Sequence, residues 1–160
     1  MKEIAEVLLL ILVANGSPVI VSFLFSHRLS LPVDFGLKLK DQQYLFGKTK
    51  TWRGLIMSLA LTASVSVLLD GEYYIGLLIS LLAMTGDLFS SFIKRRLKKA
   101  SSSEMLLLDQ LPESVLPAVM MMSVIPLNLT QVIAIVIAFY IIERMVSKML
   151  FKIGIRKRPY

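Results

Sequence analysis

The stretch YYIGLLISLLAMTGDLFSSFIKRR, residues 73–96, decides the class of fold. From Tyr73 to Ile93 it contains a single charged residue, Asp87. A membrane-spanning helix needs roughly 20 predominantly apolar residues, within a range of about 17–25. The stretch is therefore long and apolar enough to cross a bilayer, and it ends in three consecutive cations, Lys94, Arg95 and Arg96.

The composition of the whole chain points the same way. Its 160 residues are 56% hydrophobic, with a mean hydropathy of +0.71 and a net charge of +7. Soluble domains are only about 45–50% apolar, and a disordered chain has the opposite composition. We therefore predict an integral membrane protein whose residues 1–160 form one domain. The absence of Cys and the single His exclude disulfides and thiolate or His-rich metal centres, so any metal must be bound by oxygen.

Four other stretches are apolar enough to be helices in the membrane. They are Ile4 to Phe25, about Trp52 to Leu69, Leu106 to Ile125, and a stretch from Leu129 that continues as an amphipathic helix through Lys152. We predict an all-α, polytopic membrane protein with about five transmembrane helices. The first stretch is expected to be a retained helix, because no cleavage site follows it. Within it, Asn15-Gly16-Ser17-Pro18 should break or kink the helix.

The basic residues predict how these helices are oriented. Six of the 18 Lys and Arg lie in 27–53, five in 94–104 and six in 143–160, and only Lys2 remains. Short segments rich in Lys and Arg stay in the cytoplasm. We expect cytoplasmic loops near 27–53 and 94–108, a basic C-terminal tail at 143–160, and an external N-terminus. In the simplest interpretation these cations only set the topology and contact anionic head groups.

Three carboxylates need another explanation, because Asp87, Asp109 and Glu113 fall within or at the ends of apolar stretches. A carboxylate at the middle of a transmembrane helix costs about 2.5–3.5 kcal/mol on insertion scales. Asp109 and Glu113 share a face if the fourth helix starts near Asp109, with Pro112 in its first turn. Carboxylates that face one another repel unless a cation lies between them. We predict that these acids bind an oxygen-coordinated divalent cation, Mg²⁺ or Ca²⁺. Mg²⁺ bound by a few carboxylates usually completes its shell with phosphate oxygens.

Polar residues follow Asp87 along one helical face, at the spacing Ser90, Ser91, Lys94 and Arg95. The two cations can compensate phosphate charge. A plain ion pair between Asp87 and Lys94 remains an alternative, as does an N-cap role for Asp109.

The segment FGKTKTWRG, residues 46–54, leads directly into the second helix. Thr49 or Thr51 can cap that helix, and the free N–H groups at its start can receive a phosphate. The glycine spacing does not match a Walker loop. Trp52 is equally well explained as an anchor at the membrane interface.

Residues 86–96, GDLFSSFIKRR, followed by LDQLPE at 108–113, resemble the signature region of CTP:phosphatidate cytidylyltransferases. The match is closest to their short archaeal relatives, the CDP-archaeol synthases, which also show an Asn-Gly-x-Pro sequence in the first helix and an FGKTKTWRG-like loop. The bacterial and eukaryotic signature continues into a His-Gly-Gly sequence, which this chain lacks. Glu113 stands where a third acid of that signature is expected.

The resemblance implies a membrane nucleotidyltransferase that joins CTP to the ether lipid 2,3-bis-O-geranylgeranyl-sn-glycerol 1-phosphate. CDP-archaeol and pyrophosphate would be the products, and the active site would face the cytoplasm. Mg²⁺ is the expected cofactor, bound by Asp87 and Asp109 with Glu113 nearby, and the catalytic residues are Asp87, Asp109, Lys94 and Arg95. Contacts to CTP are expected from Lys48, Thr49, Thr51, Arg53, Ser90, Ser91, Lys94 and Arg95, and contacts to the lipid from Asn15 and Pro18.

Other partners and functions stay open at this point. We expect contact with membrane lipids and no nucleic acid, and a homodimer is compatible with the sequence. The main alternative activity is that of a CTP-dependent polyprenol kinase or another lipid phosphotransferase. A small transporter or assembly subunit is less favoured, because the chain shows no internal repeat and its acids gather at one end of the predicted helices.

Overall fold

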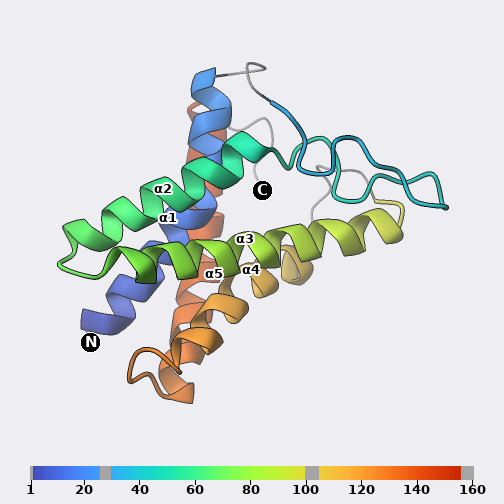
Figure 1. The fold of residues 1–160 in the computed structure, drawn as a ribbon. Coiled ribbons are helices and arrows are strands. Elements are labelled where there is room, and N and C mark those ends of the chain that lie inside the picture. The colour runs from blue at the N-terminus through green and yellow to red at the C-terminus, as the bar shows by residue number, and fades with distance from the viewer. Residues whose placement is uncertain (1, 26–29, 100–104, 156–160) are drawn as a thin grey trace.

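The computed structural model describes residues 2–25, 30–99 and 105–155 (Figure 1). These residues form five helices and no strands: α1 (Lys2–Phe25), α2 (Trp52–Leu68), α3 (Tyr73–Arg96), α4 (Leu106–Met121) and α5 (Leu129–Lys152). Each apolar stretch of the sequence corresponds to one helix, so the predicted all-α fold is confirmed.

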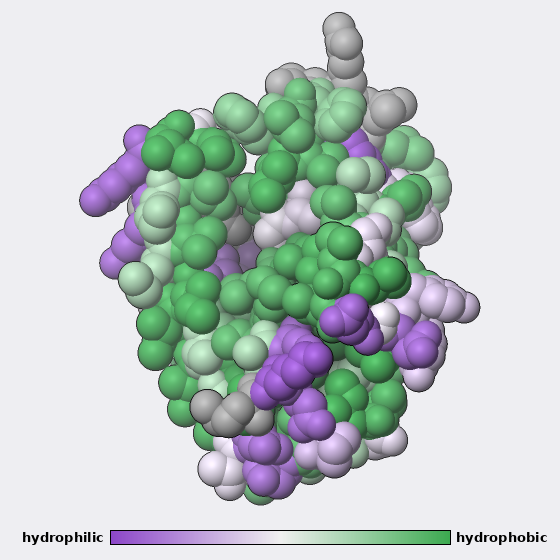
Figure 2. All heavy atoms as spheres, turned by 90° about the vertical axis from the view of Figure 1, so that its left-hand side faces the viewer, coloured by the Kyte–Doolittle hydropathy of each residue, from purple (hydrophilic) through white to green (hydrophobic). Residues whose placement is uncertain are grey.

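Three of the helices, α1, α3 and α5, are long and apolar enough to cross a membrane. With 17 and 16 residues, α2 and α4 are shorter. At 1.5 Å per residue they extend about 26 and 24 Å, against a hydrocarbon core of about 30 Å. Large hydrophobic side chains are exposed along α1 and α5, including Ile20, Phe23, Ile133, Ile137 and Ile141. Figure 2 shows a face that is mainly hydrophobic, with hydrophilic residues in separate clusters. This surface is that of a membrane protein.

Helix α1 is continuous through Pro18, and its axis changes direction near its middle (Figure 1), so of the predicted break or kink the structure shows a kink. Pro18 has no N–H to donate to the carbonyl of Ala14. That carbonyl instead accepts a 2.7 Å hydrogen bond from the hydroxyl of Ser58 in α2. The neighbouring Asn15 donates its amide to the carbonyl of Ile11 at 3.0 Å. The helix therefore bends without leaving a buried carbonyl unpaired.

Small residues allow α2 to pack closely against its neighbours. Its buried residues recur at every fourth position: Gly54, Ser58, Thr62 and Ser66. The hydroxyls of Ser58 and Ser80 lie 2.8 Å apart. A Cβ atom at Gly76 of α3 would lie 2.5 Å from the carbonyl oxygen of Thr62. Small residues at four-residue spacing are typical of interfaces between membrane helices.

One end of the bundle brings together three segments that are distant in sequence. A small cavity there is lined by residues that include Glu6 of α1, Leu69 and Gly71 from the α2–α3 turn, and Ile125 from the α4–α5 connection. In Figure 1 the N-terminus and the α2–α3 turn both lie at the left. The loop 30–51 and the C-terminal end of α3 lie toward the other end of the bundle, at the right (Figure 1).

The structure corrects several predicted boundaries. The expected loop 94–108 is shorter, because α3 continues to Arg96 and α4 begins at Leu106. Cations in the last turn of α3 are favoured by the helix dipole. Helix α4 begins at Leu106, where the apolar stretch begins, so Asp109 is in its first turn and Pro112 lies in the second turn instead of the first. Helix α5 continues to Lys152, as predicted, so residues 143–152 of the basic tail are helical. Residues 26–29, 100–104 and 156–160, which contribute to the predicted basic segments, lie outside the described residues.

Candidate active site

The loop 30–51 is organised around Asp34, a buried carboxylate with 6% of its surface exposed. Its Oδ1 accepts from the backbone N–H of Gly36 at 3.0 Å, and its Oδ2 accepts from those of Phe46 and Gly47 at 2.9 and 3.0 Å. Burial alone would raise the pKa of Asp34, but the hydrogen bonds from Gly47, Phe46 and Gly36 lower it below its usual value. Asp34 therefore joins the start of the loop to the segment that precedes α2.

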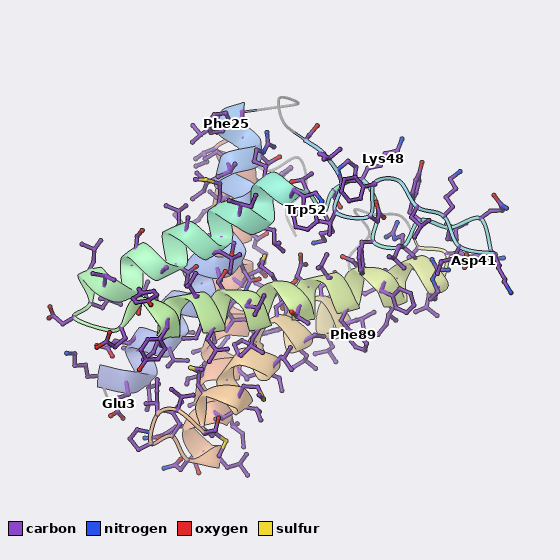
Figure 3. All side chains as sticks on the ribbon, in the orientation of Figure 1. Glu3, Phe25, Asp41, Lys48, Trp52 and Phe89 are labelled. Atoms are coloured by element: carbon purple, nitrogen blue, oxygen red, sulfur yellow. The ribbon has the colours of Figure 1, made fainter. Side chains whose placement is uncertain are left out.

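The tip of the same loop is attached to the C-terminal end of α3. The guanidinium of Arg96 donates to Asp41 at 2.5 Å and to the carbonyl of Tyr44 at 2.7 Å. Figure 3 shows Asp41 at this tip, beside the end of α3. With Asp34 at its base and Arg96 at its tip, the loop is held alongside α3.

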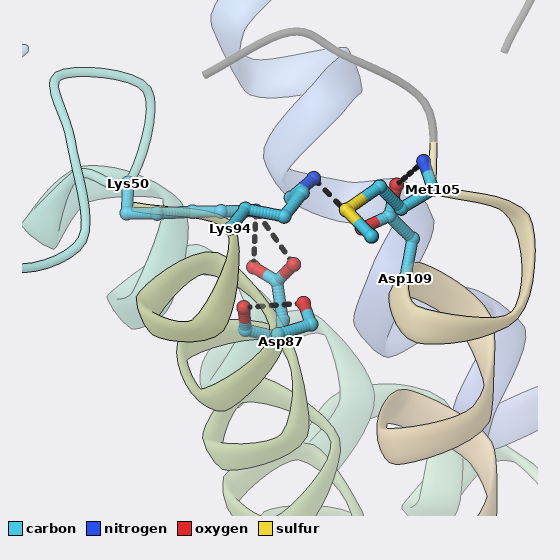
Figure 4. Close-up of polar contacts among 6 residues, drawn as sticks. Lys50, Asp87, Lys94, Met105 and Asp109 are labelled. Carbon is cyan, nitrogen blue, oxygen red and sulfur yellow. Dashed lines mark hydrogen bonds and ion pairs between the residues drawn. The ribbon is translucent and has the colours of Figure 1, made fainter. Parts of the chain in front are cut away.

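From this loop, Lys50 reaches Asp87 in α3 (Figure 4). Its Nζ lies 2.5 Å from Oδ1 and 2.6 Å from Oδ2, so it contacts both oxygens of the carboxylate. Burial alone would lower the pKa of Lys50, but the charges of Asp87, Glu113 and Asp109 raise it above its usual value. Lys50 is therefore a cation that faces a group of acids.

A second ion pair joins α3 to α4. Lys94 Nζ lies 2.7 Å from Oδ1 of Asp109, and Oδ2 of Asp109 accepts from the backbone N–H of Met105 at 3.1 Å (Figure 4). In the structure Asp87 and Lys94 each form an ion pair with another segment, although the charge of Lys94 still acts on Asp87. Asp109 is not the N-cap, a position that Met105 occupies, but it receives the N–H of that residue.

Glu113 lies beside Asp87 across the contact between α3 and α4, close enough for the two side chains to interact. This proximity depends on Gly86, because a Cβ atom there would lie 2.8 Å from the backbone nitrogen of Glu113 and closer still to the carbonyl of Pro112. Two carboxylates in contact cannot both stay ionised without a cation nearby.

The three predicted acids do not converge on one point, because Asp87 and Glu113 lie together and Asp109 lies beside them. Within residues 2–25, 30–99 and 105–155, no group of three or more Asp, Glu, His or Cys side chains is arranged to hold a metal. Asp87 and Glu113 are in contact, whereas Asp109 is engaged by Lys94. Their oxygen donors fit Mg²⁺, which is commonly bound by one or two carboxylates together with substrate phosphates.

A fourth acid, Glu143 of α5, joins this region and was not singled out in the sequence. Its carboxylate accepts a hydrogen bond from the side-chain amide of Gln110 in α4. It also lies close enough to Glu113 for their charges to interact. Because Glu143 is counted among the residues of the basic tail, its sequence position gave no indication of this contact.

The structure places the remaining predicted residues in different surroundings. Ser90, Ser91, Lys94 and Arg95 are buried together on the face of α3 that follows Asp87, and the hydroxyl of Ser90 donates to the carbonyl of Asp87 at 2.9 Å. Thr51 caps α2 by accepting from the N–H of Gly54 at 3.3 Å, as predicted.

The other predicted residues lie in the loop, in the first turn of α2 and in α1. Lys48 and Thr49 are exposed, and Lys48 lies over the ring of Tyr44. Arg53 is half-buried in the first turn of α2, and Pro18 packs against Gly54 where α1 and α2 cross. Lys50 is a second site residue, besides Glu143, that sequence reasoning missed, although it stands within the FGKTKTWRG segment that drew attention to Lys48.

Replacing Asp34 with Asn is expected to loosen the loop, because an amide offers one acceptor oxygen where the carboxylate offers two. We expect the amides of Phe46 and Gly47 to exchange hydrogen about tenfold faster, which corresponds to about 1.4 kcal/mol. Because the pKa of Asp34 is lowered by folding, its ionised form stabilises the loop fully at a pH above the usual pKa of 3.8. This stabilisation is lost as the pH falls below 3.8 and through the lowered pKa of the folded protein. Hydrogen exchange from pH 3 to pH 7 measures both effects.

The matched control is Asp70→Asn, which changes an exposed acid in the α2–α3 turn at the other end of the bundle. It should leave exchange in the loop as in the native protein. Equal exchange of Phe46 and Gly47 in the Asp34 variant and the native protein would contradict the role assigned to Asp34.

Comparison with known proteins gives a consistent result. The family model described as CarS-like, CDP-archaeol synthase, matches residues 4–160. The CDP-archaeol synthase of Sulfurisphaera tokodaii is 32% identical over 156 residues, which cover 93% of this chain and 90% of that protein. That of Saccharolobus solfataricus is 37% identical over 123 residues, covering 74% of this chain and 70% of that protein.

A solved structure, described as an intramembrane enzyme for archaeal membrane lipids biosynthesis, matches the fold with a TM-score of 0.77. It is 26% identical and covers 89% of this chain and 90% of its own. The residues matched by the family model include the acids of α3 and α4 and the loop that carries Lys50. The chain therefore belongs to the CDP-archaeol synthase family.

Proposed function

We propose that the acids and lysines at one end of the bundle carry out cytidylyl transfer from CTP to an archaeal ether-lipid phosphate, giving CDP-archaeol and pyrophosphate. The chain is an enzyme of the CDP-archaeol synthase family. The observation that carries the assignment of the site is the meeting of Asp87, Glu113, Asp109, Lys50 and Lys94 where α3, α4 and the loop come together. The proposed lipid substrate is 2,3-bis-O-geranylgeranyl-sn-glycerol 1-phosphate.

The reaction needs little acid–base chemistry from the protein. An oxygen of the lipid phosphate attacks the α-phosphorus of CTP and forms a new P–O bond, while the bond from that phosphorus to the bridging oxygen breaks. Pyrophosphate leaves with the electron pair. Because the attacking oxygen is already an anion, no general base is required, and catalysis consists of positioning and charge stabilisation.

The residues of the site can supply both positioning and charge stabilisation. Lys94 and Arg95 are buried at the C-terminal end of α3, where their charges can stabilise the leaving pyrophosphate. Asp87 and Glu113 offer carboxylate oxygens that would hold Mg²⁺, with Asp109 close by. When bound, the ion would withdraw charge from the phosphates that it contacts.

The proposed orientation places this site in the cytoplasm, where CTP is available. Five spans with an external N-terminus would put the loop 30–51 and the end of α3 inside. The bundle geometry supports this proposal, because Glu6, the α2–α3 turn and the α4–α5 connection meet at the opposite end.

Sealed vesicles test the activity and the orientation together, because CTP does not cross a bilayer. With labelled CTP, Mg²⁺ and the ether-lipid phosphate, inside-out vesicles should form labelled CDP-lipid. Right-side-out vesicles should form it only after they are permeabilised. Thin-layer chromatography or mass spectrometry identifies the lipid product, and release of pyrophosphate is measured in parallel.

Each alternative has its own result in this experiment. A polyprenol kinase would produce CDP and a phosphorylated polyprenol instead of pyrophosphate and a CDP-lipid. Product formation in right-side-out vesicles that are still sealed would contradict the proposed orientation.

A further inference from the structure

Lys50 contacts both carboxylate oxygens of Asp87, which are the atoms that a divalent cation would need. The ammonium lies 2.5 and 2.6 Å from the two carboxylate oxygens, so both are occupied by one cation. The side chains of Lys50 and Asp87 are 26% and 18% exposed, which makes this pair one of the more sheltered ion pairs of the described residues. A metal ion that binds Asp87 through these oxygens must first displace Lys50.

The charges around this contact favour such a displacement. Glu113 lies beside Asp87, and the charges of Asp87, Glu113 and Asp109 all act on Lys50. Lys94 also acts on Asp87 through its charge, but its ion pair is with Asp109 at 2.7 Å. Lys50 is therefore the cation in contact with Asp87, whereas a divalent ion would balance the charges of both Asp87 and Glu113.

The attachment of Lys50 allows it to move without changing the helices. It belongs to the loop and not to the bundle, and its backbone is fixed by hydrogen bonds to Val33 at 2.8 Å and Gly47 at 3.3 Å. Its four-carbon side chain can change rotamer while this backbone stays in place. When it leaves Asp87, the ammonium remains near any phosphate that the same acids approach through a metal.

We propose that Lys50 is an exchangeable internal cation, which neutralises Asp87 in the substrate-free protein and transfers to a phosphate of the bound nucleotide when a divalent ion takes its place. The first half of the proposal, the exchange of Lys50 for a divalent ion at Asp87, concerns metal binding alone. The second half, the transfer of Lys50 to a phosphate, rests on the proposed function, because it requires a nucleoside triphosphate at this site. Lys50 would thus couple nucleotide binding to metal binding.

The test compares Lys50→Met with Lys40→Met, which removes the same charge from an exposed position of the same loop. Purified proteins are titrated with Mn²⁺, and electron paramagnetic resonance measures free and bound metal. Without nucleotide, Lys50→Met should bind Mn²⁺ about tenfold more tightly than the native protein, within the usual range of coupling between two sites. Lys40→Met should bind it as the native protein does. Unchanged or weaker binding by Lys50→Met would overturn the proposal.

A second measurement uses the native protein and does not depend on a variant that folds. An amine-reactive ester labels lysines, and mass spectrometry reports the extent at Lys50. Labelling should increase several-fold when Mn²⁺ is added, and it should fall again when CTP is added with the metal. Labelling that does not respond to Mn²⁺ would contradict the exchange.

These two experiments separate the inference from the proposed function. A protein that responds to Mn²⁺ as expected but not to CTP would retain the first half and remove the second. Turnover of CTP with no response of Lys50 to Mn²⁺ would leave the function intact and overturn the inference.

Discussion

Replacing Asp87 with Asn is expected to lower the rate of CDP-lipid formation by about 10²–10³-fold, the usual cost of removing one group that stabilises charge in a transition state. The amide has nearly the same shape, but it carries no charge and is a poor ligand for a hard cation. Asp87 is the acid that contacts both Lys50 and Glu113. Its loss therefore affects the metal, the lysine and the second carboxylate together.

The same substitution should leave the fold intact. Asp87 lies on one face of α3, near its cytoplasmic end in the proposed orientation, and removing its charge relieves the repulsion with Glu113. The variant is purified in detergent, its elution on size exclusion is compared with that of the native protein, and turnover is measured at saturating CTP. Asp70→Asn, at the opposite end of the bundle, is the control and should retain native turnover. A near-normal rate for Asp87→Asn would remove this residue from the site.

The helices could be predicted from the sequence because their lengths are set by runs of apolar residues. The expected stretch from about Trp52 to Leu69 and the observed α2, Trp52–Leu68, agree to within one residue. The predicted helix ends that fall at polar residues were less accurate. The chain from 94 to 108 looked like a loop because it is basic, yet helices tolerate cations at their C-terminal ends.

The pairing of charges could not be predicted, because it depends on contacts between helices. Lys94 follows Asp87 by seven residues on one face of α3, about 10 Å along the axis. At that separation each side chain has a better partner on a neighbouring segment, Lys94 with Asp109 and Asp87 with Lys50. Only the packed arrangement of α3, α4 and the loop determines these pairs.

The loop illustrates the same limit. Asp34 is an unremarkable acid in a basic segment, and its hydrogen bonds to Phe46 and Gly47 join residues 12 and 13 positions apart. No local pattern indicates such a closure. By contrast, the close contact of α2 has a local signal in the sequence that we did not use, the four-residue repeat of Gly54, Ser58, Thr62 and Ser66.

Replacing Gly86 with Ala is expected to disturb both the stability of the bundle and the geometry of the site. The added methyl group would lie 2.8 Å from the backbone nitrogen of Glu113 and closer to the carbonyl of Pro112. Because these are backbone atoms, no side chain can rotate to make room, and α4 must move away from α3. Excess volume in a packed core costs about 1–3 kcal/mol. We expect this loss of stability and, because Glu113 moves away from Asp87, a rate of CDP-lipid formation at least tenfold lower.

Two other glycines distinguish these effects. At Gly16, inside α1, an added Cβ meets nothing within 4 Å, so Gly16→Ala should keep native turnover and should not lower stability, since Ala favours a helix more than Gly does. At Gly76 it would lie 2.5 Å from the carbonyl oxygen of Thr62, far along α3 from Asp87. Gly76→Ala should therefore lower the unfolding temperature as Gly86→Ala does, but its folded fraction should retain more activity. Thermal unfolding in detergent and turnover per folded molecule provide the comparison. Equal turnover in the two variants would show that close approach at Gly86 serves packing alone, and native stability in Gly86→Ala would contradict the contact itself.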